Sequence, residues 1–263
     1  MGRVDRLAAI LDILAEDGQV EVDELVRRLA ISPATARRDL DTLAEQQLLS
    51  RTRGGAVAQT IAYDLPLRYK DRQFADQKLA IAQTASALVP RGAVVGLCGG
   101  TTATAIATVL MSRPDIMEAA PQPNLTVVTN ALNIATQLSM RPQIKTVVTG
   151  GIVNTRSYEL VGGYAESVLD RVTLDLAFIG ANGIDPVRGP TSFDDREASV
   201  NALMASRAAK AIVVADSSKI DKTAFATIGR PGLFSTLITD EGITADQHAR
   251  FTERGYDVIV AAL

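Results

Sequence analysis

Residues 94–102 of the chain read Val-Val-Gly-Leu-Cys-Gly-Gly-Thr-Thr. The first four residues have the pattern of a buried β-strand, and the glycines allow a tight turn into a helix. Such a turn at the carboxyl end of a strand leaves backbone N–H groups and the positive helix end facing outward. The stretch predicts an anion-binding loop of Gly99, Gly100, Thr101 and Thr102, although a plain strand-to-helix turn capped by threonine has the same pattern.

Six further short apolar runs follow along the chain and alternate with stretches of helical pattern. The runs lie at residues 125–128, 146–148, 176–179, 211–214, 236–238 and 258–260. The helical stretches include 102–110, 131–138, 165–169 and 196–209. Apolar strands that alternate with helices predict an α/β fold with a mainly parallel sheet covered on both faces.

Polar or glycine-rich residues follow several of these strands. They are Thr129-Asn130, Gly150-Gly151, residues 180–183 and residues 216–219. Because the carboxyl ends of parallel strands meet at one crevice, we expect these groups to gather beside the 99–102 loop. Each group alone is typical of an ordinary turn. Together they favour a small phosphorylated ligand, for which Lys219 offers a positive charge.

The first sixty residues have a different pattern, with three predicted helices and a ribbon. Apolar positions spaced three and four apart predict helices at 3–16 and 23–30. Ser32 is a good N-cap for a third helix at 33–46, and Pro33 suits its first position. Alternating residues around Gly54-Gly55 predict a β-wing. This arrangement indicates a winged helix-turn-helix domain.

Several polar side chains of the third helix and the wing are expected to contact a DNA duplex. Arginine suits guanine edges and phosphates, and hydroxyls suit phosphates. The candidates are Ser32, Thr35, Arg37, Arg38, Arg51 and Arg53. The alternative is a small helical bundle that binds another protein and whose arginines only contact water.

Composition limits the classes of function. The chain has 263 residues, 47% of them hydrophobic, and a net charge of −3, which excludes wholesale disorder and a basic coat for nucleic acid. One cysteine and one histidine exclude an internal disulfide and His-rich or Cys-rich metal sites. We therefore expect no metal and no cofactor. No apolar run is long enough to cross a membrane, and the charged start is unlike a signal peptide, so we expect a cytoplasmic protein.

The amino-terminal pattern resembles the winged helix-turn-helix of the DeoR family of transcriptional regulators. The resemblance is carried by residues 22–25, 32–40 and 53–56, above all by Thr-x-Arg-Arg-Asp-Leu and the Gly-Gly-Ala wing end. Two departures are Ala36, where the family usually has isoleucine, and Thr52-Arg53, where a histidine often precedes the glycines. Neither departure removes a charge.

The rest of the chain, from about residue 76, resembles the DeoR sensor domain, which is similar in fold to ribose-5-phosphate isomerases and binds phosphorylated sugars or their metabolites. The resemblance is carried by residues 78–82, 99–102, 127–130, 150–151, 178–183, 216–219 and 237–240, together with Gly162. It implies that Gly100, Thr101 and Thr102 hold the phosphate near Lys219. Further residues would border the sugar, namely Asn130, Gly151 and Asn182.

A sugar-phosphate isomerase is the alternative function. Where the isomerases have Asp-Gly-Ala-Asp-Glu, this chain has Ile-Gly-Ala-Asn-Gly at 179–183. Glu197 lies where the isomerase base would fall, so an acid remains while its partners do not. We expect Asp195 or Glu197 to accept sugar hydroxyls without turnover. A ligand-binding module without a DNA role is the third reading.

These observations predict residues 1–58 as a DNA-binding domain, 59–75 as a linker and 76–263 as an effector domain. The resemblance implies a repressor of a carbohydrate-utilisation operon that a phosphorylated sugar releases. We expect no enzymatic activity. The expected partners are double-stranded operator DNA and further copies of the chain, as a homodimer or homotetramer.

Overall fold

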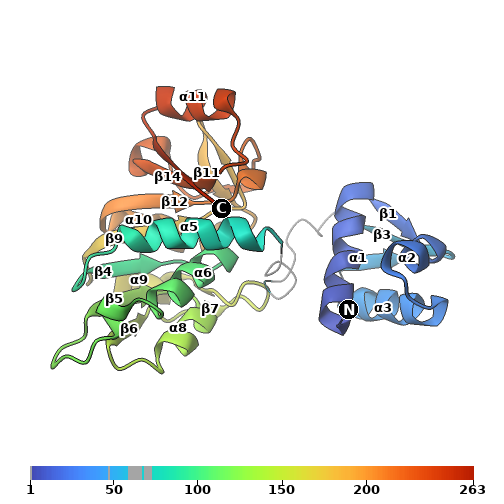
Figure 1. Cartoon of the computed structure of the whole chain (residues 1–263), viewed down its shortest axis with the longest axis horizontal. Helices are drawn as coiled ribbons and strands as arrows, with labels where there is room; N and C mark the ends of the chain where they lie inside the picture. Colours follow the sequence, from blue (N-terminus) through green and yellow to red (C-terminus); the bar gives the residue numbers. More distant parts are fainter. Residues whose placement is uncertain (1, 47, 59–66, 68–72) are drawn as a thin grey trace. The chain divides into compact units, whose positions relative to one another are not determined.

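The computed structural model describes residues 2–46, 48–58, 67 and 73–263. The chain divides into two compact units, Met1–Gln73 and Phe74–Leu263 (Figure 1). Each unit has its own cluster of buried hydrophobic residues. Most of the expected linker, residues 59–75, lies outside the described residues, and the linker boundaries stay a prediction.

Within its described residues, the smaller unit has three helices and a three-stranded antiparallel sheet, which makes it a winged helix-turn-helix. The sheet order is β1-β3-β2. The elements are α1 (Arg3–Asp17), β1 (Gln19–Glu21), α2 (Val22–Leu29), α3 (Pro33–Glu45), β2 (Leu49–Arg51) and β3 (Gly55–Ala58). The wing is therefore β2 and β3, and the unpredicted strand β1 pairs with β3 behind it.

The helices of the smaller unit meet around fully buried side chains of the predicted apolar stripes. Ile10 of α1, Leu25 of α2 and Leu40 of α3 each have no exposed surface. Gly18 ends α1 in a left-handed conformation with φ 73°, and its N–H donates to the Leu14 carbonyl. Glycine adopts this conformation at little cost, so the chain can turn directly into β1.

A buried ion pair joins α1 to α3. Asp39 has a side chain 1% exposed and accepts hydrogen bonds from Nε and Nη2 of Arg6, whose side chain is 16% exposed. This contact gives Asp39 of the Arg-Arg-Asp motif a structural role. It fixes the angle of α3 from behind, while Arg37 and Arg38 remain exposed on the other side of the helix.

Within its described residues, the larger unit has a seven-stranded sheet in which every neighbouring pair is parallel. The strand order is β15-β14-β12-β9-β4-β5-β6. The strands are β4 (Val94–Leu97), β5 (Leu125–Thr129), β6 (Ile144–Val148), β9 (Leu174–Gly180), β12 (Ala208–Val214), β14 (Thr236–Asp240) and β15 (Asp257–Ala261). All seven predicted apolar runs are strands of this sheet, and β4 lies inside it.

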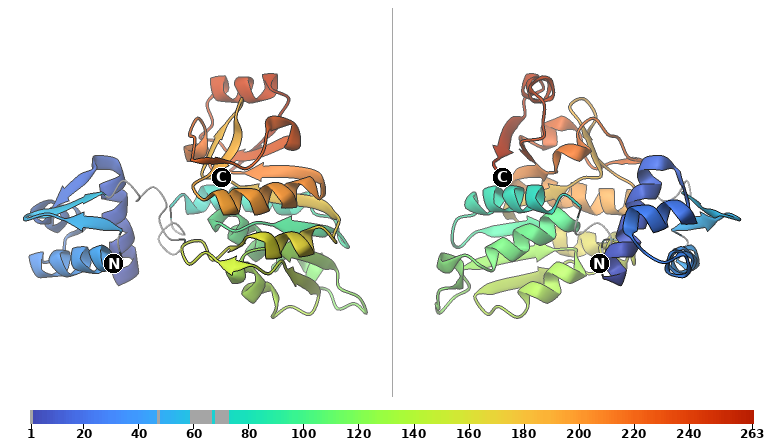
Figure 2. Two further views of the ribbon diagram at one scale, coloured as in Figure 1. Left: turned by 180° about the vertical axis from the view of Figure 1, so that it is seen from behind. Right: turned by 45° about the vertical axis from the view of Figure 1, so that its right-hand side comes forward.

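Helices cover both faces of this sheet, as Figures 1 and 2 show. On one face α5 packs on α6 and α6 on α8, and on the other face α9 packs on α10. The helices are α5 (Ala75–Ala87), α6 (Thr101–Leu110), α7 (Pro114–Met117), α8 (Leu132–Leu138), α9 (Gly163–Leu169), α10 (Asp195–Ser206) and α11 (Ala245–Glu253). None of the described helices has the length and apolar character that a membrane span needs.

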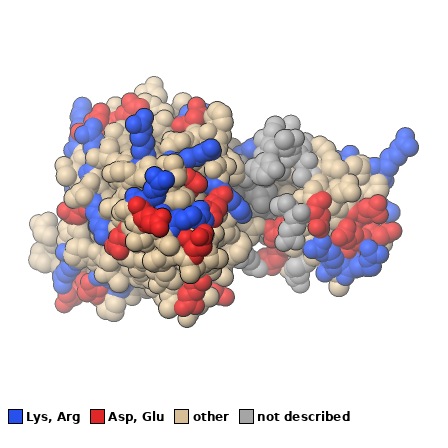
Figure 3. Space-filling model, turned by 90° about the horizontal axis from the view of Figure 1, so that it is seen from above, with Lys and Arg blue, Asp and Glu red and all other residues tan. Residues whose placement is uncertain are grey.

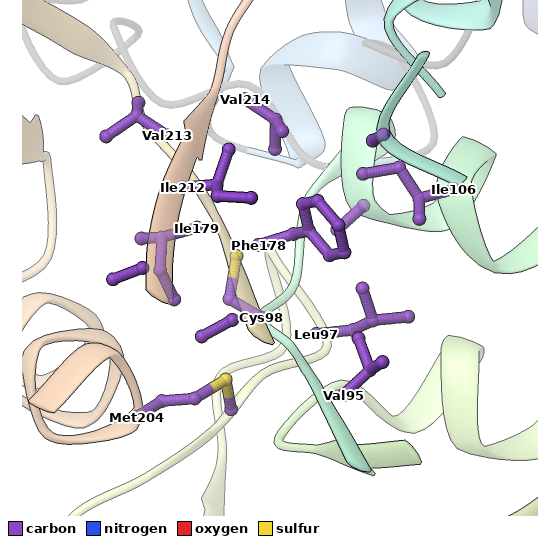
Figure 4. Packing of buried hydrophobic residues seen from close by; sticks show 14 of the residues in the cluster. Val95, Leu97, Cys98, Ile106, Phe178, Ile179, Met204, Ile212, Val213 and Val214 are labelled. Atoms are coloured by element: carbon purple, nitrogen blue, oxygen red, sulfur yellow. The ribbon is translucent and has the colours of Figure 1, made fainter. Parts of the chain in front are cut away.

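The core of the larger unit is packed tightly around β4 and β9. Figure 4 shows Phe178 of β9 near Ile106 of α6, and Met204 of α10 farther along the same cluster. A Cβ on Gly96 would lie 3.0 Å from Cγ of Met204 and 2.8 Å from Cδ1 of Leu174. The glycine in the middle of β4 is thus explained by the close approach of α10.

Two smaller antiparallel sheets lie outside the parallel one, and the sequence does not predict them. The first is a hairpin of β7 (Ile152–Val153) and β8 (Leu160–Val161). The second contains β10 (Gly183–Asp185), β11 (Gly189–Ser192) and β13 (Ala226–Thr227). The N–H of Leu160 donates to the Asn130 carbonyl at 2.6 Å, which ties the hairpin to the end of β5.

Replacing Asp39 with alanine should destabilise the smaller unit by about 2 kcal/mol, because it leaves the Arg6 guanidinium without its buried partner. Hydrogen exchange of the α1 and α3 amides measures the opening free energy of this unit within the whole chain. The control is Asp17→Ala, which removes an exposed pair with Arg28 and should cost less than about 1 kcal/mol. Equal effects of the two variants would contradict the structural role of Asp39.

Candidate functional site

Helix α3 is capped as the sequence predicts. The Ser32 hydroxyl accepts a hydrogen bond from the Thr35 N–H at 3.1 Å, and the two side-chain oxygens lie 2.8 Å apart. Pro33 occupies the first turn. Ser32 and Thr35 therefore hold the start of the helix in place, and the positive end of the helix dipole lies beside their hydroxyls.

Two arginines project from the exposed side of α3. Arg37 and Arg38 are exposed, and within the described part of the chain neither side chain makes a hydrogen bond or an ion pair. The opposite side of the helix buries Ala36, Leu40 and Leu43 in the core. The helix thus presents two unneutralised guanidinium groups on a rigid support, as contact with a major groove requires.

The two wing arginines differ in their surroundings. Arg51 donates from Nε to Oδ1 of Asp41 at 2.8 Å and from Nη1 to the Gly55 carbonyl. Arg53 is exposed, and no partner is found for its side chain among the described residues. Arg51 therefore ties the wing to α3, whereas Arg53 lies free at the wing tip.

In the larger unit, the predicted anion loop joins β4 to α6. Gly100 has φ 101°, a conformation that strongly favours glycine, and a Cβ there would meet no atom within 4 Å. Its carbonyl accepts from the N–H and hydroxyl of Thr104. The first-turn N–H groups of Thr101 and Thr102 have no intrahelical partner, because no helix residue precedes them. Open space beside unpaired amides is the geometry of an anion site.

On the face drawn in Figure 3, the described residues of the larger unit form no large patch made of basic side chains alone. Basic and acidic side chains are interspersed there over the larger unit. Among the described residues, no group of three or more His, Cys, Asp or Glu side chains is arranged to hold a metal ion. The amino-terminal end of α6 is a source of positive potential for an anionic ligand beside β4.

A buried glutamate lies directly against this loop. Glu159, 5% exposed, comes from the β7–β8 hairpin and accepts from the amide nitrogens of Asn130 at 2.9 Å and Asn201 at 3.3 Å. A Cβ on Gly99 would lie 2.3 Å from Cγ of Glu159. Burial, reinforced by the charge of Glu197, raises the pKa of Glu159 to about 8.

Glu197 lies at the start of α10 and is 7% exposed. Its Oε1 accepts hydrogen bonds from the Ser157 hydroxyl and, at 2.8 Å, from the Asn154 amide. Ser192 donates to Oε2 at 3.4 Å. Two carboxyl groups from different parts of the chain thus lie in one polar cluster beside the anion loop.

Several of the predicted effector residues belong to this cluster. Asn130 has no exposed surface and donates to Glu159, and Oδ1 of Asn182 accepts from the Phe193 N–H at 3.1 Å. Ser192 donates to both Asn182 and Glu197, so it connects two of the predicted residues. The expected gathering of strand ends is therefore present around β4, β5 and β9.

Three predicted effector residues have other surroundings. Asp195 is exposed at the first turn of α10. Gly151 has φ 135°, and a Cβ there would lie 2.8 Å from the Val161 carbonyl, so it shapes the β7–β8 hairpin. Lys219 is half-buried in a 3-10 turn, Ser217–Lys219, that follows β12, the second strand away from β4.

Sequence reasoning missed the members of the cluster that come from the hairpin and from the middle of α10. They are Asn154, Ser157, Glu159 and Asn201. One signal was available, since Asn201 follows Glu197 by four residues and therefore lies on the same helix face. The hairpin offered no comparable signal, because its two strands are only two residues long.

Cys98 also lies under the loop, where it connects β4 to β9. Its thiol accepts from the Gly180 N–H at 3.0 Å and donates to the Gly99 carbonyl at 3.1 Å. Burial and the nearby glutamates raise the pKa of this thiol well above its usual range. Cys98 is therefore a packing residue and not a reactive nucleophile.

Comparisons with known proteins agree with both units. Residues 6–62 match the DeoR-like helix-turn-helix domain, and residues 73–241 match the DeoR C terminal sensor domain. The chain belongs to the DeoR family. It is 28% identical over 240 residues to the glycerol-3-phosphate regulon repressor of Escherichia coli K12, covering 91% of this chain and 92% of that relative. It is 31% identical over 261 residues to the HTH-type transcriptional regulator GolR of Listeria innocua, covering 98% of each.

Among solved structures, a ribose 5-phosphate isomerase A from Methanocaldococcus jannaschii aligns with a TM-score of 0.42 and 22% identity. The alignment covers 56% of this chain and 55% of that chain. The chain is therefore a DNA-binding transcriptional regulator, with its helix-turn-helix in the smaller unit and its sensor domain in the larger one.

The raised pKa of Glu159 predicts how stability depends on pH. Between its ordinary value of 4.5 and about 8, the folded larger unit holds a proton that the unfolded chain releases. The free energy of unfolding therefore falls as pH rises through this window. Glu159→Gln removes this dependence. The Tm of the variant minus the Tm of wild type should therefore increase by about 5 °C between about pH 5 and about pH 8.

Thermal melts of the whole chain at several pH values measure this difference. Glu166→Gln is the matched control, because Glu166 is exposed on α9. Its Tm should follow the wild-type curve at every pH. A Glu159→Gln curve that stays parallel to wild type would show that Glu159 keeps its charge on folding and would contradict the prediction.

Proposed function

We propose that this DeoR regulator represses a carbohydrate-utilisation operon and leaves its operator when a phosphorylated sugar binds the larger unit. The observation that carries the proposal is the presence, in one chain, of a capped helix with free arginines and an open loop of unpaired amides. The Escherichia coli relative is named as a repressor of a glycerol-3-phosphate regulon, which supports repression. Because it acts on operator DNA, we place the regulator in the cytoplasm.

In the proposed DNA complex, α3 enters the major groove and the wing contacts the backbone. Arg37 and Arg38 read base edges or phosphates, because they are exposed and unpaired within the described residues. Ser32 and Thr35 contact phosphates through their hydroxyls at the helix start. Arg53 contacts the backbone from the wing, while Arg51 holds the wing against Asp41 or exchanges that partner for a phosphate.

In the proposed effector complex, the phosphate binds the amides and hydroxyls of Gly100, Thr101 and Thr102. Lys219 supplies the balancing charge. The sugar then extends toward Asn182 and Glu197, on the side where the polar cluster lies. Asn130, Gly99 and Gly151 form the buried side of this site, and Asp195 lies at its exposed edge.

The proposed regulator acts as a homodimer or homotetramer. Paired recognition helices then bind half-sites one helical turn, or a multiple of it, apart. The effector changes DNA affinity only if it binds the DNA-free state more tightly than the DNA-bound state. The same coupling requires operator DNA to weaken effector binding by the same factor.

We propose further that the site binds sugar phosphates without converting them. Isomerisation needs a carboxylate base and groups that polarise the carbonyl. Here Asn182 stands at a position where the isomerases carry an acid, and its amide oxygen accepts hydrogen bonds from the Ser192 hydroxyl and the Phe193 N–H. Incubation of the chain with a panel of sugar phosphates should give no ketose–aldose conversion, and a measurable turnover would overturn this part.

Replacing Arg38 with alanine should weaken operator binding about tenfold or more, because each good base or phosphate contact contributes about 1–3 kcal/mol. Fluorescence anisotropy with a duplex from upstream of the regulated operon measures this change. Arg141→Ala removes an exposed arginine from the larger unit and should leave DNA affinity unchanged. Unaltered DNA affinity of Arg38→Ala would count against α3 as the recognition helix.

Replacing Thr101 or Lys219 with alanine should abolish the response of DNA binding to the effector while operator affinity persists. The reason is that each change removes a phosphate ligand from the larger unit only. Thr108→Ala serves as the control, since Thr108 is exposed farther along the same helix. The pocket assignment is wrong if the Thr101 and Lys219 variants respond as fully as the control.

A further inference from the structure

The polar cluster behind the anion loop contains two carboxyl groups, held by amide and hydroxyl side chains. Glu159 and Glu197 reach it from the β7–β8 hairpin and from α10, and both are more than nine-tenths buried. The side chains that donate to Glu159 are the neutral amides of Asn130 and Asn201. Two carboxyl groups buried side by side make a further negative charge in this cluster unfavourable.

One acceptor in the cluster has no donor. Asn130 has no exposed surface, and its nitrogen donates to Glu159 at 2.9 Å and to Asn201 at 3.4 Å, so its amide is directed into the cluster. Its oxygen finds no hydrogen-bond partner in the described structure. A buried oxygen without a donor is costly, and a hydroxyl is the group that satisfies it.

The position of the cluster links it to the proposed effector. Glu159 lies against Gly99, the first residue of the anion loop, and Asn130 follows β5, the strand next to β4. Ser192 connects Glu197 to Asn182, which borders the same edge of the sheet. A ligand with its phosphate on the loop therefore places the rest of its carbon chain against acceptors.

We propose that Glu159, together with Glu197, restricts the effector to phosphorylated sugars and polyols with a hydroxyl-bearing far end, and excludes phosphorylated sugar acids. The inference rests on the proposed function in one respect, namely that the phosphate binds at Gly100–Thr102. Hydroxyl groups donate to the carboxyl pair and to the Asn130 oxygen. A carboxylate in their place brings a further negative charge into a buried site that already holds two acidic groups, and the repulsion is largest above about pH 8, where Glu159 is ionised.

Matched ligand pairs test this selectivity directly. Sorbitol 6-phosphate and 6-phosphogluconate differ only in a terminal CH₂OH or carboxylate, and sn-glycerol 1-phosphate and D-3-phosphoglycerate, which share the configuration at C2, differ in the same way. Calorimetric titration of the whole chain with both pairs gives the ratio of Kd values for acid and polyol. We expect the wild-type chain to prefer the polyol of the pair that fits by about 100-fold.

Charge-neutral variants then identify the residues responsible. At about pH 9, where Glu159 is ionised, Glu159→Gln and Glu197→Gln each remove one carboxylate and keep the side-chain shape, so each should reduce the acid-to-polyol ratio by about tenfold. Glu166→Gln, on the exposed side of α9, should keep the wild-type ratio. An equal affinity of the wild type for acid and polyol, or an unchanged ratio in both site variants, overturns the inference.

A pH series adds a readout that a purely structural role would not change. Free phosphate monoesters titrate near pH 6, so their charge is nearly constant between about pH 7 and 9. Glu197 and Cys98 face Glu159 in the cluster. The acid-to-polyol ratio of Kd values should rise about tenfold across this range as Glu159 ionises, and Glu159→Gln should lose this rise. A wild-type ratio that is constant with pH contradicts the inference.

The failure of the proposed function gives a different result. If Thr101→Ala binds the polyol phosphate as tightly as wild type, and the ligand leaves hydrogen exchange of the amides of residues 100–102 unchanged, the phosphate does not bind at the loop and the proposed effector site is wrong. The same conclusion follows if no member of either pair and no inorganic phosphate binds the chain. The proposed effector site and the proposed selectivity are both supported if the glutamate variants lose the preference for polyol over acid while Thr101→Ala still weakens binding.

Discussion

The larger unit depends on one constraint, which is that the first-turn N–H groups of a helix have no partner within the helix. In this chain β4 ends at Leu97, and Gly100, with φ 101° and nothing within 4 Å of the place of a Cβ, allows α6 to begin at Thr101. In the proposed complex an anion satisfies the first-turn N–H groups, and the positive helix end adds to its binding. The parallel sheet holds this turn beside the ends of β5 and β9, where the polar cluster lies.

In the smaller unit, a buried ion pair fixes the position of the recognition helix. Asp39 and Arg6 fix α3 against α1, so the exposed arginines of α3 lie on a rigid support. Arg51 and Asp41 do the same for the wing. Charged residues of the recognition motif therefore have two roles, since some hold the unit together and others remain free for DNA. A regulator needs both, because contacts to a groove require a surface whose shape is fixed before binding.

The sequence was sufficient for the elements whose pattern is local. The seven apolar strands, the Ser32 cap and the glycine turn at residues 99–100 were all predicted. The predicted helix at 196–209 ran too far, because Arg207, Ala208 and Ala209 favour a helix, yet Ala208 already begins β12 beside Leu174. The β7–β8 hairpin was missed, since such short strands have no periodicity. Glu159, which lies in this hairpin, was missed for the same reason. Its place in the polar cluster depends on hydrogen bonds from Asn130 and Asn201, which are far from it in the sequence.

The central claim is that a phosphorylated metabolite binds the backbone amides at the start of α6. Hydrogen exchange of the whole chain, with a sugar phosphate that raises its Tm and with the dephosphorylated sugar, tests this claim most directly. We expect the phosphorylated form to slow exchange of the amides of residues 100–102 and the dephosphorylated form to leave their exchange unchanged. Unchanged exchange at these amides, in the presence of a sugar phosphate that releases the operator, would contradict it.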